Sequence, residues 1–401
     1  MSIIIFLVHI ISWAIFIYLA ANTGYLLFMA LCGRLIKNKK FSPAFPKHRI
    51  AVLIPCFKED LIIRDTALKA RQHNYPSEQF SVTVIADKLK PETVEALRMI
   101  PVEVLEVDLN MKSRSLHQAL ETSGVMDSEL VMILDSDNIM AAGCLEKVNA
   151  AYGAGYQAIQ CHRTAKNKNT AVALLDAMSE EININLFRRG PAAAGLSAAP
   201  IGSGMAFQTT LIREIFSLPQ ILENPGEDRE IDMQLMARGI EMEFIDDAWV
   251  YDEKVASAGV FEKQRVRWLE AQVNHVKRFF DKDFKGVPKT FLYYNKFFQN
   301  LLLPRVLTLV LFIFLLVVMG LQYFLHRHIL EPAPGAWVWV MGFYFLTLFL
   351  SIPRSFYNVQ TLHAISRVPI LMFSMVRALT QMKKKRKEFL HTPKSFTQNH
   401  P

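Results

Sequence analysis

The chain has 401 residues, a net charge of +8, 51% hydrophobic residues and 28 Phe. This length allows more than one structural unit, and the apolar content argues against a single soluble globule and for membrane embedding. The basic residues gather at the edges of apolar stretches, without a basic patch interleaved with aromatic residues. The charge therefore indicates membrane orientation and not nucleic-acid binding.

The first apolar segment, residues 3–31, contains no Asp, Glu, Lys or Arg. It exceeds the roughly 20 residues that a spanning helix needs. A cleaved signal peptide is the alternative, but the basic n-region of such a peptide is missing. We therefore predict a transmembrane anchor over residues 1–33 and a linker over 34–48. The positive-inside rule places the next domain in the cytoplasm, because four cations follow the anchor: Arg34, Lys37, Lys39 and Lys40.

Residues 49–290 have the pattern of an α/β domain. The buried strands are expected at 50–55, 80–86, 102–107, 131–134, 156–161 and 244–250. The helices are expected at 60–73, 91–99, 113–121, 171–188 and 261–280, and a further helix follows 226–229 and runs through about 237. Strands that alternate with helices predict a mostly parallel, Rossmann-like sheet with helices on both faces.

The apolar pattern returns after this domain. Residues 291–352 predict two transmembrane helices, and residues 353–401 predict an interfacial amphipathic helix followed by a basic tail. Three spans leave the N-terminus outside and put the α/β domain and the tail inside. We expect an integral membrane protein of the plasma membrane, or of the inner membrane if it is bacterial, with the α/β domain on the cytoplasmic side.

Two carboxylates, Asp135 and Asp137, end the apolar strand at 131–134. Side chains at the carboxyl end of a strand in an open α/β sheet face the crevice where ligands bind. The two carboxylates repel each other, and hard oxygen ligands beside a phosphate-bearing substrate suit Mg²⁺ or Mn²⁺. Asp and Ser also favour turns, so the pair by itself fits a strand that simply ends in a turn.

Three further motifs accompany this pair. Asp87 follows the second strand, and Glu227-Asp228 opens a helix. Each of these alone also fits a helix cap or an acidic first helical turn. In Gln264-Arg265-Val266-Arg267-Trp268, the first and last residues are four apart and share a helix face. In this order the set resembles the membrane-bound family-2 inverting glycosyltransferases of GT-A fold, such as the hyaluronan, chitin and cellulose synthases.

The resemblance covers about residues 49–300 and the flanking membrane helices. It implies that Asp137, together with Asp135, binds the metal, and that Asp228 is the general base. Glu227 would raise the basicity of Asp228 or cap the helix. The donor-binding residues that it implies are Asp87, Lys112, Asp135, Gly202, Ser203 and Gly204. The residues that it implies for the acceptor and the pyrophosphate are Gln264, Arg265, Arg267 and Trp268.

We therefore expect a membrane-embedded inverting glycosyltransferase that uses a UDP-sugar and Mg²⁺ or Mn²⁺ to form β-glycosidic bonds in a polysaccharide. Transfer of a single sugar to a membrane lipid is the alternative enzyme, and a non-catalytic membrane scaffold is the alternative of another class. The expected partners are the UDP-sugar, a glycan or lipid acceptor and the bilayer, without nucleic acid. A homo-oligomer or a partner subunit would complete a passage for a polymer.

Overall fold

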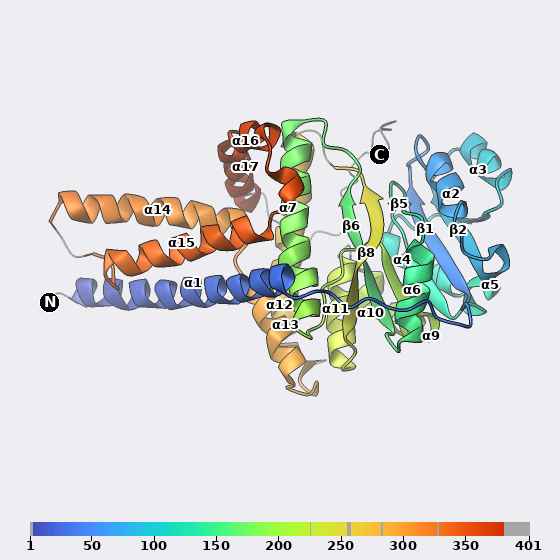
Figure 1. Cartoon of the computed structure of the whole chain (residues 1–401), viewed down its shortest axis with the longest axis horizontal. Coiled ribbons are helices and arrows are strands. Elements are labelled where there is room, and N and C mark those ends of the chain that lie inside the picture. The colour runs from blue at the N-terminus through green and yellow to red at the C-terminus, as the bar shows by residue number, and fades with distance from the viewer. Residues whose placement is uncertain (1–2, 225, 255–257, 282–283, 327–328, 381–401) are drawn as a thin grey trace.

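The computed structural model describes the chain apart from residues 1–2, 225, 255–257, 282–283, 327–328 and 381–401. Side chains at 4, 258–265, 267–268, 371, 374–375 and 378–380 are not described either. Figure 1 shows two parts, a group of long apolar helices and an α/β domain, with helix α7 running across the junction between them.

Within the described residues, eight strands form one sheet in the order β3-β2-β1-β4-β7-β6-β8-β5. Most neighbours pair in parallel, but β7 is antiparallel to β4 and β6, and β5 is antiparallel to β8. The strands are β1 (Ile50–Phe57), β2 (Phe80–Asp87), β3 (Glu103–Val107), β4 (Leu130–Ile133), β5 (Ile139–Met140), β6 (Ala158–Ala165), β7 (Met205–Gln208) and β8 (Met242–Asp252). The mostly parallel sheet is confirmed. β5 and β7 were not predicted, since such short runs carry no periodic signal.

Helices cover both faces of the sheet. Side chains of β1 alternate between two cores, with Ile50, Val52 and Ile54 in one and Ala51 and Leu53 in the other. The first core is closed by α2 (Ile63–Arg71), α3 (Pro91–Arg98) and α6 (Cys144–Gly153). The second is closed by α4 (Lys112–Leu120), α9 (Thr209–Phe216) and α11 (Glu227–Ala237). This mixed, mostly parallel sheet between two helical layers is the GT-A fold.

Helix α7 (Ala171–Ile184) continues through a π-helical turn, η2 (Asn185–Arg189), into α8 (Gly190–Ala193). Asn185 Nδ2 donates to Ser351 Oγ at 3.2 Å and to the Ala30 carbonyl at 3.4 Å. A Cβ atom on Gly33 would lie only 2.2 Å from Asn185 Oδ1, so a larger residue there would displace the Asn185 side chain from these contacts. These hydrogen bonds connect the α/β domain directly to the ends of α1 and of the helix that ends at Ser351.

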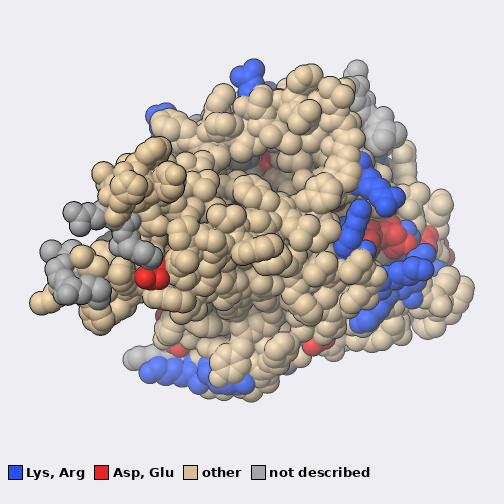
Figure 2. Space-filling model, turned by 60° about the vertical axis from the view of Figure 1, so that its left-hand side comes forward, with Lys and Arg blue, Asp and Glu red and all other residues tan. Residues whose placement is uncertain are grey.

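Three of the described helices are long and apolar enough to cross a membrane: Ile5–Leu35 within α1 (Ile3–Leu35), α14 (Arg305–Phe324) and α15 (Pro334–Ser351). Their outer surface carries large exposed apolar side chains, such as Phe314 and Trp339. Figure 2 shows this side of the molecule as a mostly uncharged surface, with Lys and Arg gathered at its edges. An exposed apolar surface of this kind suits contact with lipid.

The remaining helices follow the last strand. α12 (Ala258–Arg278) and α13 (Phe291–Leu301) pack beside α11. After α15, the single interfacial helix of the sequence analysis is replaced by η4 (Arg354–Phe356), α16 (Val359–Ile365) and α17 (Val368–Thr380). Pro369 lacks a backbone N–H and therefore favours a new helix start. The basic run at 383–387 lies outside the described residues, and the domain boundaries stay predictions.

Candidate active site

The carboxyl ends of the parallel strands β2, β1 and β4 meet at one edge of the sheet. Asp87 is the last residue of β2, and Asp135 follows β4 by two residues. The chain then turns, with the Asn138 N–H donating to the Asp135 carbonyl at 2.9 Å. The first three predicted carboxylates, Asp87, Asp135 and Asp137, therefore lie along the edge where open α/β sheets bind ligands.

The segment Gly202–Gly204 lies beside this turn because β7 runs antiparallel to β4 and pairs Met205 with Ile133. The Asp135 N–H donates to Ser203 Oγ at 2.9 Å, and Ser203 Oγ donates to Asn138 Oδ1 at 2.8 Å. Ser203 is fully buried, so its hydroxyl holds the turn in place. Gly202 has φ +88°, a left-handed conformation that favours glycine.

Two polar side chains that the sequence analysis did not single out shape the same segment. Gln160 Nε2 donates to the carbonyls of Ser203 and Gly204 at 3.0 and 3.1 Å, and Gln160 Oε1 accepts the Ile201 N–H at 3.0 Å. Arg188 donates to the Ala199 and Pro200 carbonyls at 2.8 and 2.7 Å. The sequence offers only two signals for them: a polar Gln within the expected strand 156–161 and an Arg at the end of the expected helix 171–188.

Lys112, the first residue of α4, joins the predicted groups. Its Nζ lies 2.7 Å from Asp135 Oδ1, 2.7 Å from the Gly202 carbonyl and 3.0 Å from Glu227 Oε1. Burial lowers the pKa of Lys112, but the charges of Asp135 and Glu227 raise it by more. The net pKa is therefore raised, and the ammonium stays protonated. The pKa of Glu227 is raised, chiefly by burial, with Lys112 opposing the shift and Asp228 adding to it.

Asp228 lies in the first turn of α11, directly across from the glycine segment. Its Oδ1 accepts the Arg229 N–H at 2.8 Å, while its Oδ2 lies 3.6 Å from the position of a Cβ atom on Gly202. The half-buried carboxylate therefore has one oxygen held by the helix and the other close to the segment that borders Asp135. A carboxylate in this position can serve as a general base.

Asp87 has one satisfied and one unsatisfied oxygen. Its Oδ2 accepts the Asn110 N–H at 2.7 Å and the Ser115 hydroxyl at 3.4 Å. Its Oδ1 is buried without a hydrogen-bond partner, and burial raises the pKa of the carboxyl group. A buried acceptor without a partner is costly, so this oxygen marks a place for a ligand donor.

Asp135 and Asp137 are the residues that fit a metal. Asp137 accepts hydrogen bonds from Asn138 Nδ2 at 3.1 Å and from the Glu253 N–H at 3.2 Å. In the described part of the chain, no three His, Cys, Asp or Glu side chains gather into a complete metal site. Mg²⁺ commonly takes one or two carboxylates and completes its shell with substrate phosphates and water. Two carboxylates on one turn fit a cation of that kind.

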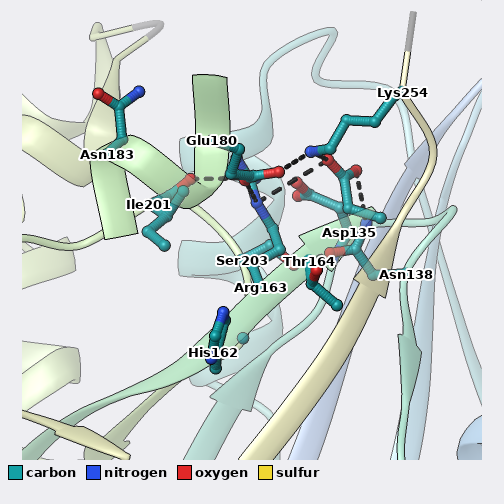
Figure 3. A network of polar contacts seen from close by, with 12 residues as sticks. Asp135, Asn138, His162, Arg163, Thr164, Glu180, Asn183, Ile201, Ser203 and Lys254 are labelled. Atoms are coloured by element: carbon teal, nitrogen blue, oxygen red, sulfur yellow. Dashed lines mark hydrogen bonds and ion pairs between the residues drawn. The ribbon is translucent and has the colours of Figure 1, made fainter. Parts of the chain in front are cut away.

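A second polar network, which the sequence analysis missed, supports the Asp135–Asn138 turn (Figure 3). Asn138 Nδ2 donates to Asp252 Oδ1 at 3.1 Å, and Lys254 pairs with both Asp252 and Glu180. Arg163 pairs with Glu180 at 2.6 Å and donates to the Ile201 carbonyl at 3.3 Å. Through α7 the network links the Asp135–Asn138 turn to the segment before Gly202.

The predicted acceptor residues lie on α12, whose backbone is helical. The side chains of Gln264, Arg265, Arg267 and Trp268 lie outside the described residues, so their role stays a prediction.

The sequence profile of the family described as glycosyltransferase like family 2 matches residues 46–271. The mannosyltransferase PcManGT from Pyrobaculum calidifontis, solved in complex with GDP-Man and Mn²⁺, superposes with a TM-score of 0.56 and 17% identity over 92% of this chain and 99% of that chain. TarS 1–349 from S. aureus has a TM-score of 0.44 and 12% identity over 84% and 93%. No curated protein matches the chain. At 17% identity the likeness to the mannosyltransferase concerns the fold alone.

Proposed function

The chain belongs to glycosyltransferase family 2, and on this premise we propose that it is a membrane-embedded inverting enzyme that uses a nucleotide-sugar donor and a divalent metal. The convergence of Asp135, Lys112, Glu227 and Asp228 around Gly202 carries the proposal. The four charged residues come from three separate segments: the turn after β4, the start of α4 and the start of α11. A scaffold without activity has no physical need to hold them together, since burying charge is costly.

Asp87 and the metal-binding turn would hold the donor. The unsatisfied Oδ1 of Asp87 accepts a donor group of the base or ribose, which we propose to be those of UDP. Asp135 and Asp137 would hold Mg²⁺ or Mn²⁺, which offsets the negative charge that develops on the departing diphosphate. The Mn²⁺ bound to the Pyrobaculum mannosyltransferase supports a divalent ion in this site. Because that enzyme binds GDP-Man, the choice between uracil and guanine in the donor has to be tested for this chain.

Asp228 would remove the proton from the acceptor hydroxyl while that oxygen attacks the anomeric carbon. The carbon–oxygen bond to the diphosphate breaks in the same displacement, so the configuration inverts and a β-linkage results from an α-linked donor. General base catalysis of this type contributes about 10²–10⁴ in rate. Gln264, Arg265, Arg267 and Trp268 on α12 would bind the acceptor and the pyrophosphate.

The acceptor is either a growing polysaccharide or a membrane lipid. The space between α1, α14 and α15 is filled by buried side chains, among them Leu19, Phe312, Trp337 and Tyr344. A polymer passage would therefore need additional helices, from a second copy or from a partner subunit. This packing is the reason to keep a second candidate function beside polysaccharide synthesis, namely the transfer of one sugar to an amphiphilic acceptor.

Donor turnover tests the proposal. Full-length protein in nanodiscs is given UDP-sugars and GDP-Man with Mn²⁺ or Mg²⁺, and the released nucleotide and the product size are measured. We expect metal-dependent release from one donor, reduced about 10²–10⁴-fold in Asp228→Asn. Asp127→Asn, at an exposed position, is the matched control and should keep full activity. Equal rates in both variants would refute the role of Asp228, and a short product would identify the single-sugar reaction.

A further inference from the structure

A cavity of about 380 Å³ lies on the other side of β6 from the candidate active site, where α1 and α15 end. Its lining includes Arg34 from α1, Arg354 after α15 and Lys168 after β6. His162 and Thr164 of β6 contact Glu181 on this side, whereas Arg163 pairs with Glu180 in the network under the active site. Adjacent strand residues point to opposite faces, so the two sites are separate.

The lining is strongly cationic. Arg34, Lys168 and Arg354 have no carboxylate partner among the described residues, and Arg189 is held by Asp246 at 2.7 Å. The one carboxylate of the lining, Glu181, accepts the Thr164 hydroxyl at 2.7 Å and contacts His162. The cavity therefore has an excess of positive charge that nothing in its own lining balances.

The positive-inside rule explains Arg34 and Arg354 but does not explain the partly open pocket or Lys168. Lys168 comes from the α/β domain, and its ammonium lies 4.6 Å from the Phe356 ring centre, which turns it toward the helix ends. The volume lies within the range of ordinary ligand pockets, about 300–1,000 Å³. Cations from two parts of the molecule converge on one space large enough for a ligand.

We propose that this interface cavity binds a phosphate group, carried either by a membrane lipid or by a soluble phosphate compound. Arginine and lysine side chains form charge-assisted hydrogen bonds with phosphate oxygens. The position at the ends of two candidate spans favours the lipid, whose headgroup would enter the cavity while its tails lie along α1 and α15. The site lies beyond the donor site of the proposed function, and only its lipid form rests on the proposed membrane insertion.

Binding is measured on the full-length protein in detergent. One arm follows retention of phosphatidylglycerol against phosphatidylcholine by native mass spectrometry, and another follows the thermal shift caused by inorganic phosphate at constant ionic strength. The cavity variant is Lys168→Gln with Arg354→Gln, both exposed side chains. The matched control is Arg64→Gln with Lys90→Gln, exposed cations at α2 and just before α3, on the far end of the α/β domain.

We expect the cavity variant to bind about tenfold more weakly for each cation removed, and the control to bind like the wild type. Ser355→Trp, which adds bulk to the lining without removing charge, should weaken binding as well. Loss of phosphatidylglycerol alone identifies a lipid site, and loss of inorganic phosphate binding identifies a soluble ligand. Unchanged binding in the cavity variant, or equal loss in the control, would overturn the proposal. Nucleotide release is measured on the same cavity variant. A failure of the phosphate-binding proposal can therefore be told apart from a failure of the proposed glycosyltransferase reaction.

Discussion

Lys112→Met removes the one ammonium that contacts both Asp135 and Glu227 while keeping most of the apolar stem. The side chain of Glu227 is 8% exposed and that of Lys112 is 20% exposed, so water replaces little of the lost charge. Breaking a buried pair costs about 3 kcal/mol at the lower end of the usual range. At about 2–4 °C per kcal/mol for a domain of this size, the apparent Tm should fall by about 6–12 °C.

The loss of stability in Lys112→Met should depend on pH, and the direction of this dependence follows from the pKa of Glu227. The pKa of Glu227 is already raised by burial, and the loss of Lys112 raises it further. A carboxyl group whose folded pKa is raised favours the folded state below its unfolded pKa, and this contribution is lost as pH rises through the folded pKa. The destabilisation of Lys112→Met should therefore be smallest at acid pH and should grow toward neutral pH.

A double-mutant cycle isolates the pair. Glu227→Gln alone and Lys112→Met with Glu227→Gln are unfolded thermally in nanodiscs beside the wild type at several pH values. The double variant should be more stable than the sum of the single effects predicts, by about 0.5–3 kcal/mol. Lys88→Met, which breaks an exposed pair with Asp108 at 3.3 Å, is the control and should cost less than about 0.5 kcal/mol. Additive single effects, or a Lys112→Met protein as stable as the control, would refute the reasoning.

Three other outcomes are expected. Asp87→Asn should raise the KM for the donor about tenfold with a smaller change in kcat, because in the proposed function the unpartnered Oδ1 would accept a hydrogen bond from the bound donor before the reaction; steady-state kinetics checks this difference between KM and kcat. Gly202→Ala should lower stability by about 1–2 kcal/mol and reduce turnover, since φ is +88° beside Asp228; a variant with the wild-type Tm contradicts this. Burial lowers the pKa of His162, but contacts with Asp246 and Glu181 raise it more, so the net pKa is raised. Its stabilising contribution is present below 6.5 and is lost as pH rises through the folded pKa, so the Tm difference between wild type and His162→Gln should narrow with rising pH.

The sequence determines the local elements of this protein. The buried runs at 50–55, 80–86 and 131–134 appear as β1, β2 and β4, because apolar β-branched segments bounded by polar residues have few other stable states. The three candidate spans follow from length and composition alone. Asp135 and Asp137 were placed correctly at a strand end, since that position depends only on the neighbouring residues.

The tertiary structure decides which of these elements meet. Nothing in the four residues of β7 predicts its antiparallel pairing with β4, yet this pairing brings Gly202 beside Asp135. Lys112 and Glu227 are far apart in sequence and meet only because α4 and α11 close the same face of the sheet. The residues that line the interface cavity likewise come from segments spread along the chain between Gly33 and Phe356. Local patterns depend on near neighbours along the chain, whereas a site depends on long-range packing that no single segment encodes.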